Sequence, residues 1–165
     1  MEPDDSYSVE RLQAIKKKFD IHEGSDIPRI TLYTIKELCK KFGLLQTTEL
    51  NDKMYFHHQG FRKIENLHYL SGLKTLWLHG NSISIIENLE PCSELRALYA
   101  FICCVLSIYL FRYLQNNVIE AITGLDTLTH LTTLALSNNQ IHRIENLAHN
   151  IALEDLNLSH NMFVL

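Results

Sequence analysis

The sequence has little excess charge of either sign and few cysteines. Its 165 residues carry a formal net charge of -4, whereas domains that bind nucleic acid usually present a strongly basic face. The four cysteines are Cys39, Cys92, Cys103 and Cys104. Their spacing matches neither a zinc site nor a disulfide framework, and the acidic, polar residues 1–10 do not resemble a secretory signal peptide. We therefore predict a protein of the reducing cytoplasm without a nucleic-acid partner.

The motifs of common enzyme classes are also missing. The chain has only six glycines, and none of them forms a phosphate-binding loop. No Ser/His/Asp constellation is visible, and Cys39 falls on a predicted helix without a catalytic partner. We predict that the protein is not an enzyme and that it uses no cofactor and no small-molecule substrate.

Long apolar runs are scarce as well. One run, from Ala100 to Phe111, is almost continuously apolar. A transmembrane helix needs about 20 apolar residues, but Arg96 and Arg112 bound this run. It is too short to cross a bilayer comfortably, so we expect no membrane partner and judge its role from the sequence around it.

A 22-residue repeat accounts for most of the chain. Residues 73–94 and 131–152 superimpose without a gap and follow the pattern L-x-x-L-x-L-x-x-N-x-I-x-x-I-x-x-L. This is the leucine-rich repeat pattern, in which a short strand is followed by an asparagine turn and a helical or 3₁₀ return segment. Residues 51–72 form a first, degenerate repeat in the same register. We predict an α/β solenoid with a curved parallel sheet and 3₁₀ or helical segments on its convex side.

The third repeat, residues 95–130, contains fourteen surplus residues. Removing either Tyr99–Arg112 or Ala100–Tyr113 restores the pattern and places Leu114 in the core. Such a segment is difficult to accommodate within a strand, because both edges of the strand are paired. Our leading interpretation of the surplus at about 99–113 is a retained intron or gene-model error, since fourteen codons keep the reading frame. A genuine tolerated loop and a membrane-interacting hairpin are the alternatives.

An N-terminal cap and junction are predicted at residues 30–50. Ile35, Leu38 and Phe42 have helical spacing in this segment, and Gly43 follows as a stop signal. We expect the resulting helix to cover the first repeat.

The two ends of the chain differ from the repeats. Residues 1–29 are predicted to form a mobile tail with one helical piece around 9–19. At the other end, the repeat at 153–165 stops before its return segment. A terminal repeat normally has a polar cap, whereas Leu156 and Leu158 would lie under an open edge. We therefore expect the chain to be a fragment of a longer protein.

One asparagine occupies the turn position in each of four repeats: Asn81, Asn117, Asn139 and Asn161. Stacked asparagine side chains can satisfy backbone groups that the curving chain leaves unpaired. We predict a structural role for them.

The strand positions that alternate with the leucines point away from the core and can contact a partner. One such column contains Tyr55, Trp77, Tyr99 or Tyr113, Ala135 and Asn157; the next contains His57, His79, Gln115, Ser137 and Ser159. Exposed aromatic clusters commonly anchor protein interfaces. We predict a protein-binding concave face made by Tyr55, His57, Trp77, His79, Tyr99 and Gln115. The alternative is that the cap or a loop covers Tyr55 and Trp77.

The histidines of neighbouring strands raise the question of a zinc site. Such a site needs at least three protein ligands. Beyond His57 and His79 the sequence offers His58 nearby, but side-chain alternation should point it elsewhere. We predict no metal site.

The sequence also resembles a known family. The motif I-E-N-L at 64–67, 86–89 and 144–147 is similar to the 22-residue class of intracellular leucine-rich repeats typified by protein phosphatase regulatory subunits. Residues 37–90 more specifically resemble the ciliary leucine-rich repeat proteins of the dynein axonemal assembly factor 1 family. This resemblance is carried by the cap helix, the Q-T-x-x-L-N-D junction at 46–52, the H-x-Q-G-F element at 57–61 and the L-W-L at 76–78.

The resemblance implies a curved solenoid without catalytic activity. It further implies a protein-interaction scaffold for the cytoplasmic preassembly of ciliary dynein arms, present in the cytoplasm and the cilium. Dynein chains, chaperones or other assembly factors are the implied partners. A regulatory subunit of a protein phosphatase and a membrane-associated repeat fragment are the alternatives.

Overall fold

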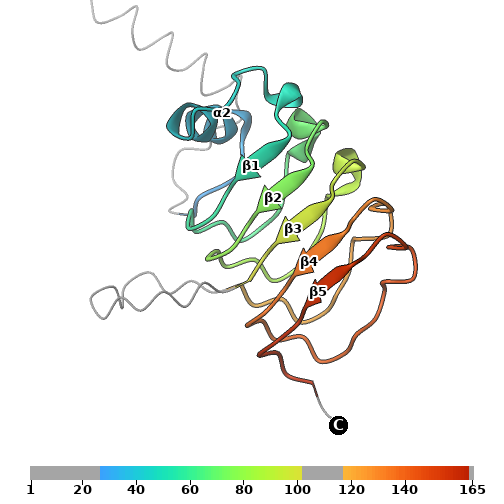
Figure 1. Ribbon diagram of the computed structural model, residues 1–165. Coiled ribbons are helices and arrows are strands. Elements are labelled where there is room, and N and C mark those ends of the chain that lie inside the picture. The colour runs from blue at the N-terminus through green and yellow to red at the C-terminus, as the bar shows by residue number, and fades with distance from the viewer. Residues whose placement is uncertain (1–26, 102–116, 164–165) are drawn as a thin grey trace, which may run out of the picture.

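The computed structural model describes residues 27–101 and 117–163, and its centre is one parallel sheet (Figure 1). Its strands lie side by side in sequence order: β1 (Lys53–Tyr55), β2 (Thr75–Trp77), β3 (Ala97–Tyr99), β4 (Thr133–Ala135) and β5 (Asp155–Asn157). Short 3₁₀ helices accompany the sheet: η1 (Thr48–Leu50), η2 (Leu67–Leu70) and η3 (Glu90–Cys92). The architecture is the leucine-rich repeat solenoid that the 22-residue spacing predicts.

The strands pair in the register that the leucine spacing predicts. Leu76 lies between Met54 of β1 and Leu98 of β3, and Leu98 in turn lies opposite Leu134 of β4. All four side chains are fully buried, because the inward positions of successive repeats stack into one core. Burying a leucine stabilises the fold by about 1.5–3 kcal/mol relative to exposure. Leu156, at the same position on β5, is 41% exposed.

The asparagine at each repeat turn joins the backbones of neighbouring repeats. Asn81 is fully buried, and its Oδ1 accepts hydrogen bonds from the N–H groups of Gln59 and Phe61. Its Nδ2 donates to the carbonyl groups of Phe56 and Leu78. Equivalent bonds to the preceding repeat are made by Asn117, Asn139 and Asn161. The structural role predicted for these asparagines is confirmed.

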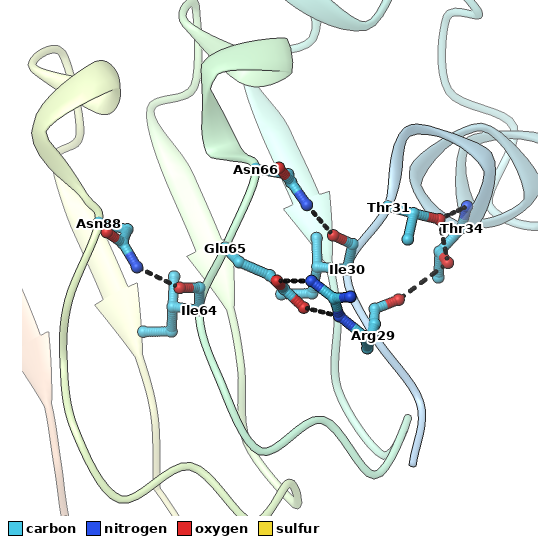
Figure 2. A network of polar contacts seen from close by, with 8 residues as sticks. All are labelled: Arg29, Ile30, Thr31, Thr34, Ile64, Glu65, Asn66 and Asn88. Carbon is cyan, nitrogen blue, oxygen red and sulfur yellow. Dashed lines mark hydrogen bonds and ion pairs between the residues drawn. The ribbon is translucent and has the colours of Figure 1, made fainter. Parts of the chain in front are cut away.

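A second ladder of hydrogen bonds runs along the return segments and uses the asparagine of the I-E-N-L motif (Figure 2). Asn66 and Asn88 have a left-handed backbone, with φ of 59° and 58°, which asparagine tolerates better than most residues. The Nδ2 of Asn66 donates to the carbonyl of Ile30, and that of Asn88 to the carbonyl of Ile64, each at 2.7 Å. Each bond ties one repeat to the segment before it.

The third repeat keeps this second ladder with different residues. Gly124 takes the left-handed position with a φ of 65°, and a Cβ there would lie 2.5 Å from the carbonyl oxygen of Ile86. An asparagine therefore does not fit at this point. The hydroxyl of Thr123 donates to the Ile86 carbonyl instead, at 3.1 Å. Asn146 resumes the pattern by donating to the carbonyl of Ile122.

The N-terminal cap extends the solenoid beyond the first repeat (Figure 2). Ile30 is fully buried, and its carbonyl takes the place that a preceding repeat would offer to Asn66. Beside it, the Arg29 guanidinium makes a bidentate ion pair with the Glu65 carboxylate, at 3.0 and 2.6 Å. Arg29 belongs to residues 1–29, which the sequence assigns to a mobile tail.

Helix α2 (Leu32–Lys41) confirms the predicted cap helix, which lies beside β1 (Figure 1). At its start the Thr31 hydroxyl accepts a hydrogen bond from the N–H of Thr34, as expected of an N-cap threonine. The helix ends at Lys41 with Phe42 as its C-cap, and the following Gly43 has a φ of 67°. The side of the helix that faces the core buries Ile35, Leu38 and Cys39.

The third repeat runs past β3 into Ala100 and Phe101 without a break in register. Ala100 is 1% exposed and occupies the core position that Leu78 has in the second repeat. Phe101 then occupies the position of His79, against which its ring stacks. The sequence pattern predicts Leu114 at this core position, and this prediction is wrong. In the structure Ala100, the residue directly after β3, occupies it.

The surplus segment falls between Phe101 and Asn117. Fifteen residues lie between Phe101 and Asn117, whereas Gly80 alone lies between the equivalent residues of the second repeat, His79 and Asn81. This position is the turn after the strand, where an insertion leaves the hydrogen bonds between the strands intact. The physical objection to a genuine loop is thus weaker than the sequence suggests.

Several predictions fall on residues outside those described. They concern the helical piece at 9–19, most of the surplus segment, and Tyr113, Leu114 and Gln115. None of the helices formed by residues 27–101 and 117–163 has the length and apolar character that crossing a bilayer requires.

Candidate protein-binding face

Three aromatic side chains form a stacked row on the concave surface of the sheet, opposite the core. Tyr55, Trp77 and Tyr99 lie side by side in β1, β2 and β3. The ring centroids of Tyr55 and Trp77 are 4.6 Å apart, and those of Trp77 and Tyr99 are 5.4 Å apart, with interplanar angles of 27° and 12°. We call this row the aromatic ladder. Because side chains alternate along a strand, Leu76 enters the core while Trp77 faces the concave surface.

A second row, the histidine ladder, runs beside the first and consists of His57, His79 and Phe101. The rings of His57 and His79 are 4.9 Å apart and those of His79 and Phe101 are 5.0 Å apart, both pairs with an interplanar angle of 4°. Phe101 takes the place that the sequence assigns to Gln115. The hydrophobic pattern did not indicate Phe101 at this position, because the Y-L-Q at 113–115 fits the leucine spacing better than the Y-A-F at 99–101.

The structure brings five of the predicted site residues together on one face: Tyr55, His57, Trp77, His79 and Tyr99. Gln115 lies outside the described residues.

The N-terminal cap covers one end of the two ladders. The ring of Phe42, at the end of α2, lies 5.2 Å from that of Tyr55 and 5.4 Å from that of His57. Among the described residues the ring neighbours of Trp77 are Tyr55 and Tyr99. The alternative of a covering cap therefore holds for the outer side of Tyr55 and does not extend to Trp77.

The concave surface changes character at β4. Ala135 and Ser137 continue the two columns with small, buried side chains. Asn157 and Ser159 follow on the β5 repeat with exposed polar ones. In the described part of the chain the aromatic surface thus belongs to the first three repeats.

The two histidines of the histidine ladder are held in their neutral form. The Nδ1 atoms of His57 and His79 are buried and have no hydrogen-bond partner among the described residues. Burial, followed by the charges of His57 and His58, lowers the pKa of His79 to about 4. Burial, followed by the charges of His58 and Lys41, also lowers the pKa of His57. At neutral pH the stacked imidazoles are therefore uncharged.

Acidification should destabilise the fold through His79. Its pKa is about 4 in the folded chain and about 6.5 in an unfolded one. Between these values the unfolded state binds more protons, so stability is complete above pH 6.5 and falls as the pH drops towards 4. The His79→Phe variant repeats the ring of Phe101 and should show a weaker pH dependence of its melting temperature, whereas the exposed His130→Phe control should not. A His79→Phe variant with the wild-type pH dependence would contradict a buried neutral imidazole.

The arrangement of these side chains suits contact with a partner better than metal binding or nucleophilic catalysis. Within residues 27–101 and 117–163 no three His, Cys, Asp or Glu side chains are grouped to hold a metal ion, and the parallel rings of His57 and His79 do not converge on one point. Burial raises the pKa of Cys39 and raises that of Cys92 to about 12. Both thiols stay protonated at neutral pH and are poor nucleophiles.

Comparison with curated proteins identifies relatives for part of the chain. It is 52% identical over 62 residues to a Dynein axonemal assembly factor 1 homolog of Drosophila erecta, a match that covers 38% of this chain and 4% of the relative. It is 47% identical over 51 residues to Dynein axonemal assembly factor 1 of Homo sapiens, covering 31% of this chain and 7% of the relative. The match thus spans less than a tenth of either relative. The resemblance to this family that the sequence motifs predict is confirmed.

The solved structures that resemble this one include two internalins of Listeria monocytogenes. An internalin (inlF) from Listeria monocytogenes superimposes with a TM-score of 0.53 and 24% identity, over 70% of this chain and 30% of that one. The functional domain of InlJ from the same species gives a TM-score of 0.55 and 19% identity, over 76% and 26%. No protein-family model matches the chain. These likenesses establish the solenoid fold and nothing about activity.

Proposed function

We propose that the chain is part of a non-enzymatic protein-interaction scaffold that acts in the cytoplasmic preassembly of axonemal dynein arms and in cilium formation. The observation that supports this most is the 52% identity over 62 residues to a protein named as an axonemal dynein assembly factor. The proposed partners are dynein chains, chaperones or other assembly factors, met in the cytoplasm and the cilium.

The aromatic and histidine ladders form the proposed partner-binding face. Tyr55, Trp77 and Tyr99 are half-buried and hold one another in place by stacking. Rings that are fixed before binding lose little conformational entropy when a partner arrives. Aromatic side chains near the centre of an interface carry much of its binding energy, and Trp77 is the central ring of the aromatic ladder.

Affinity capture from ciliated cells tests this proposal. The tagged wild-type protein should enrich axonemal dynein chains or their assembly chaperones. Trp77→Ala should weaken that binding by at least about 2 kcal/mol, or roughly 30-fold, because an interface anchor of this type is removed. Asn157→Ala, in the same column on β5, should capture the partners as the wild type does.

Two outcomes would count against the proposal. Capture of protein phosphatase catalytic subunits without dynein chains or assembly factors would favour a phosphatase regulatory subunit. Undiminished capture by a folded Trp77→Ala variant would show that the aromatic ladder does not bind the partner.

A further inference from the structure

The rings of the aromatic ladder present their edges, and not their faces, to the concave surface. Both faces of Trp77 are occupied by tyrosine rings, at 4.6 and 5.4 Å, and His79 is likewise enclosed on both faces. Ring edges carry partial positive charge. Among the described residues no hydrogen-bond partner is found for the indole N–H of Trp77 or the hydroxyl groups of Tyr55 and Tyr99. The surface therefore offers hydrogen-bond donors and positive ring edges.

Cationic residues stand at the starts of β1, β2 and β3, two or three positions before the rings of the aromatic ladder. Lys53, Lys74 and Arg96 are exposed, and the N–H of Arg96 donates to the carbonyl of Lys74, which places the two in neighbouring repeats. No ion pair neutralises these three side chains within the part of the chain that the structure describes. One carboxylate, that of the exposed Asp52, shares this edge. The edge is positive overall, although the whole chain has a net charge of -4.

The same edge reverses its charge further along the solenoid. Thr132 and Thr133 take these positions in the β4 repeat, and the exposed Glu154 and Asp155 take them in the β5 repeat. Positive charge and aromatic rings therefore coincide on the first three repeats.

We propose that the first three repeats bind an extended acidic segment of a partner protein, with its carboxylates along the edge formed by Lys53, Lys74 and Arg96 and against the ring edges of the aromatic ladder. This inference rests on the proposed function, since it names the chemistry of the partner at the same face. Neighbouring strands are about 4.8 Å apart, so cations on successive repeats reach separate carboxylates of one segment. A single-stranded nucleic acid fits less well, because its bases stack on open aromatic faces, and both faces of Trp77 and of His79 are occupied.

Fluorescence anisotropy with the full chain provides the test. The probes are fluorescein-labelled decapeptides of glutamate and of glutamine, and a labelled ten-nucleotide thymidylate. The glutamate peptide should bind, more weakly as salt is raised, and the Lys74→Glu/Arg96→Glu double variant should raise its Kd at least about ten-fold. The matched control is Arg62→Glu/Lys63→Glu, with the same charge change at exposed positions outside the strands, and it should change the Kd little. Thermal melting verifies that both double variants fold.

Three results would contradict the proposal that the partner segment is acidic. These are equal affinity for the glutamate and glutamine peptides, an unchanged Kd in the Lys74→Glu/Arg96→Glu variant, and equally tight binding of the thymidylate, which would assign the face to nucleic acid. If the glutamate peptide does not bind while Trp77→Ala still loses its captured dynein partners, the binding face stands and the acidic chemistry is wrong. If Trp77→Ala also keeps its partners, both proposals are wrong.

Discussion

Replacement of Asn81 by alanine should lower the free energy of unfolding by at least about 2 kcal/mol, because two buried backbone groups and one half-buried group lose the partner that Asn81 gives them. These are the N–H of Phe61, the carbonyl of Phe56 and the half-buried N–H of Gln59. The carbonyl of Leu78 also loses its bond to Asn81 but keeps the one from the Nδ2 of Asn117. A buried polar group without a partner costs about 1–3 kcal/mol, and the loosened turn can admit water to some of the groups.

Urea denaturation measures this loss as a shift of the midpoint at constant slope. Asn157→Ala is the control, since Asn157 is exposed and its side chain accepts hydrogen bonds from Ser159 alone among the described residues. We expect it to change the free energy of unfolding by no more than about 0.5 kcal/mol. Equal midpoints for the two variants would show that the turn asparagines do not hold neighbouring repeats in register.

Deletion of residues 100–113 should make the chain more stable than a deletion of equal length at 102–115, by about 0.5–4.5 kcal/mol. Both deletions restore the 22-residue spacing. The first brings Leu114 into the core position of Ala100, between Leu78 and Leu136, which are both fully buried. The second keeps Ala100. Leucine in place of alanine in a core is worth about 2–5 kcal/mol, and loss of the Phe101 stack offsets about 0.5–1.5 kcal/mol of that gain.

Thermal and urea unfolding of the two shortened chains and the full chain decide between the interpretations of the surplus segment. If the segment is a retained intron or gene-model error, the chain without residues 100–113 should be the most stable of the three. If that chain melted below the full-length form, the surplus would be a genuine structural element.

The strand register could be predicted from the sequence because one physical pattern determines it. Leucines spaced 22 residues apart must share one core, so Leu76 lies beside Leu98, and Trp77 consequently lies beside Tyr99. The turn asparagines were predictable for the same reason, since Asn81 recurs at a constant distance from those leucines. The predicted face of aromatic and histidine side chains follows directly from this register.

Other features could not be predicted, because they depend on backbone conformation or on chain continuity. The I-E-N-L motif is visible in the sequence, but the left-handed backbone of Asn88 and its bond to Ile64 are not. Ile30 begins this second ladder, but it lies before the first repeat, so no repeat spacing could predict its position. Hydrophobicity favours Leu114 for the core of the third repeat, yet the strand runs directly into Ala100.

Leu76 and Trp77 are neighbours on β2 with opposite environments, so together they separate folding from binding most directly. Leu76→Ala should lower the free energy of unfolding by about 2–5 kcal/mol through the cavity that it leaves. Trp77→Ala should cost less, since it removes a half-buried side chain and two stacking contacts of about 0.5–1.5 kcal/mol each.

The deciding measurement is the rescue of motile cilia, in cells without the endogenous protein, by the full-length Tyr55→Ala/Trp77→Ala double variant at wild-type abundance. If the concave face binds the partner and the opposite face holds the fold, this variant should melt above Leu76→Ala and yet fail to capture dynein partners or restore motility. Full rescue by the folded double variant would contradict the assignment of the aromatic ladder as the binding face.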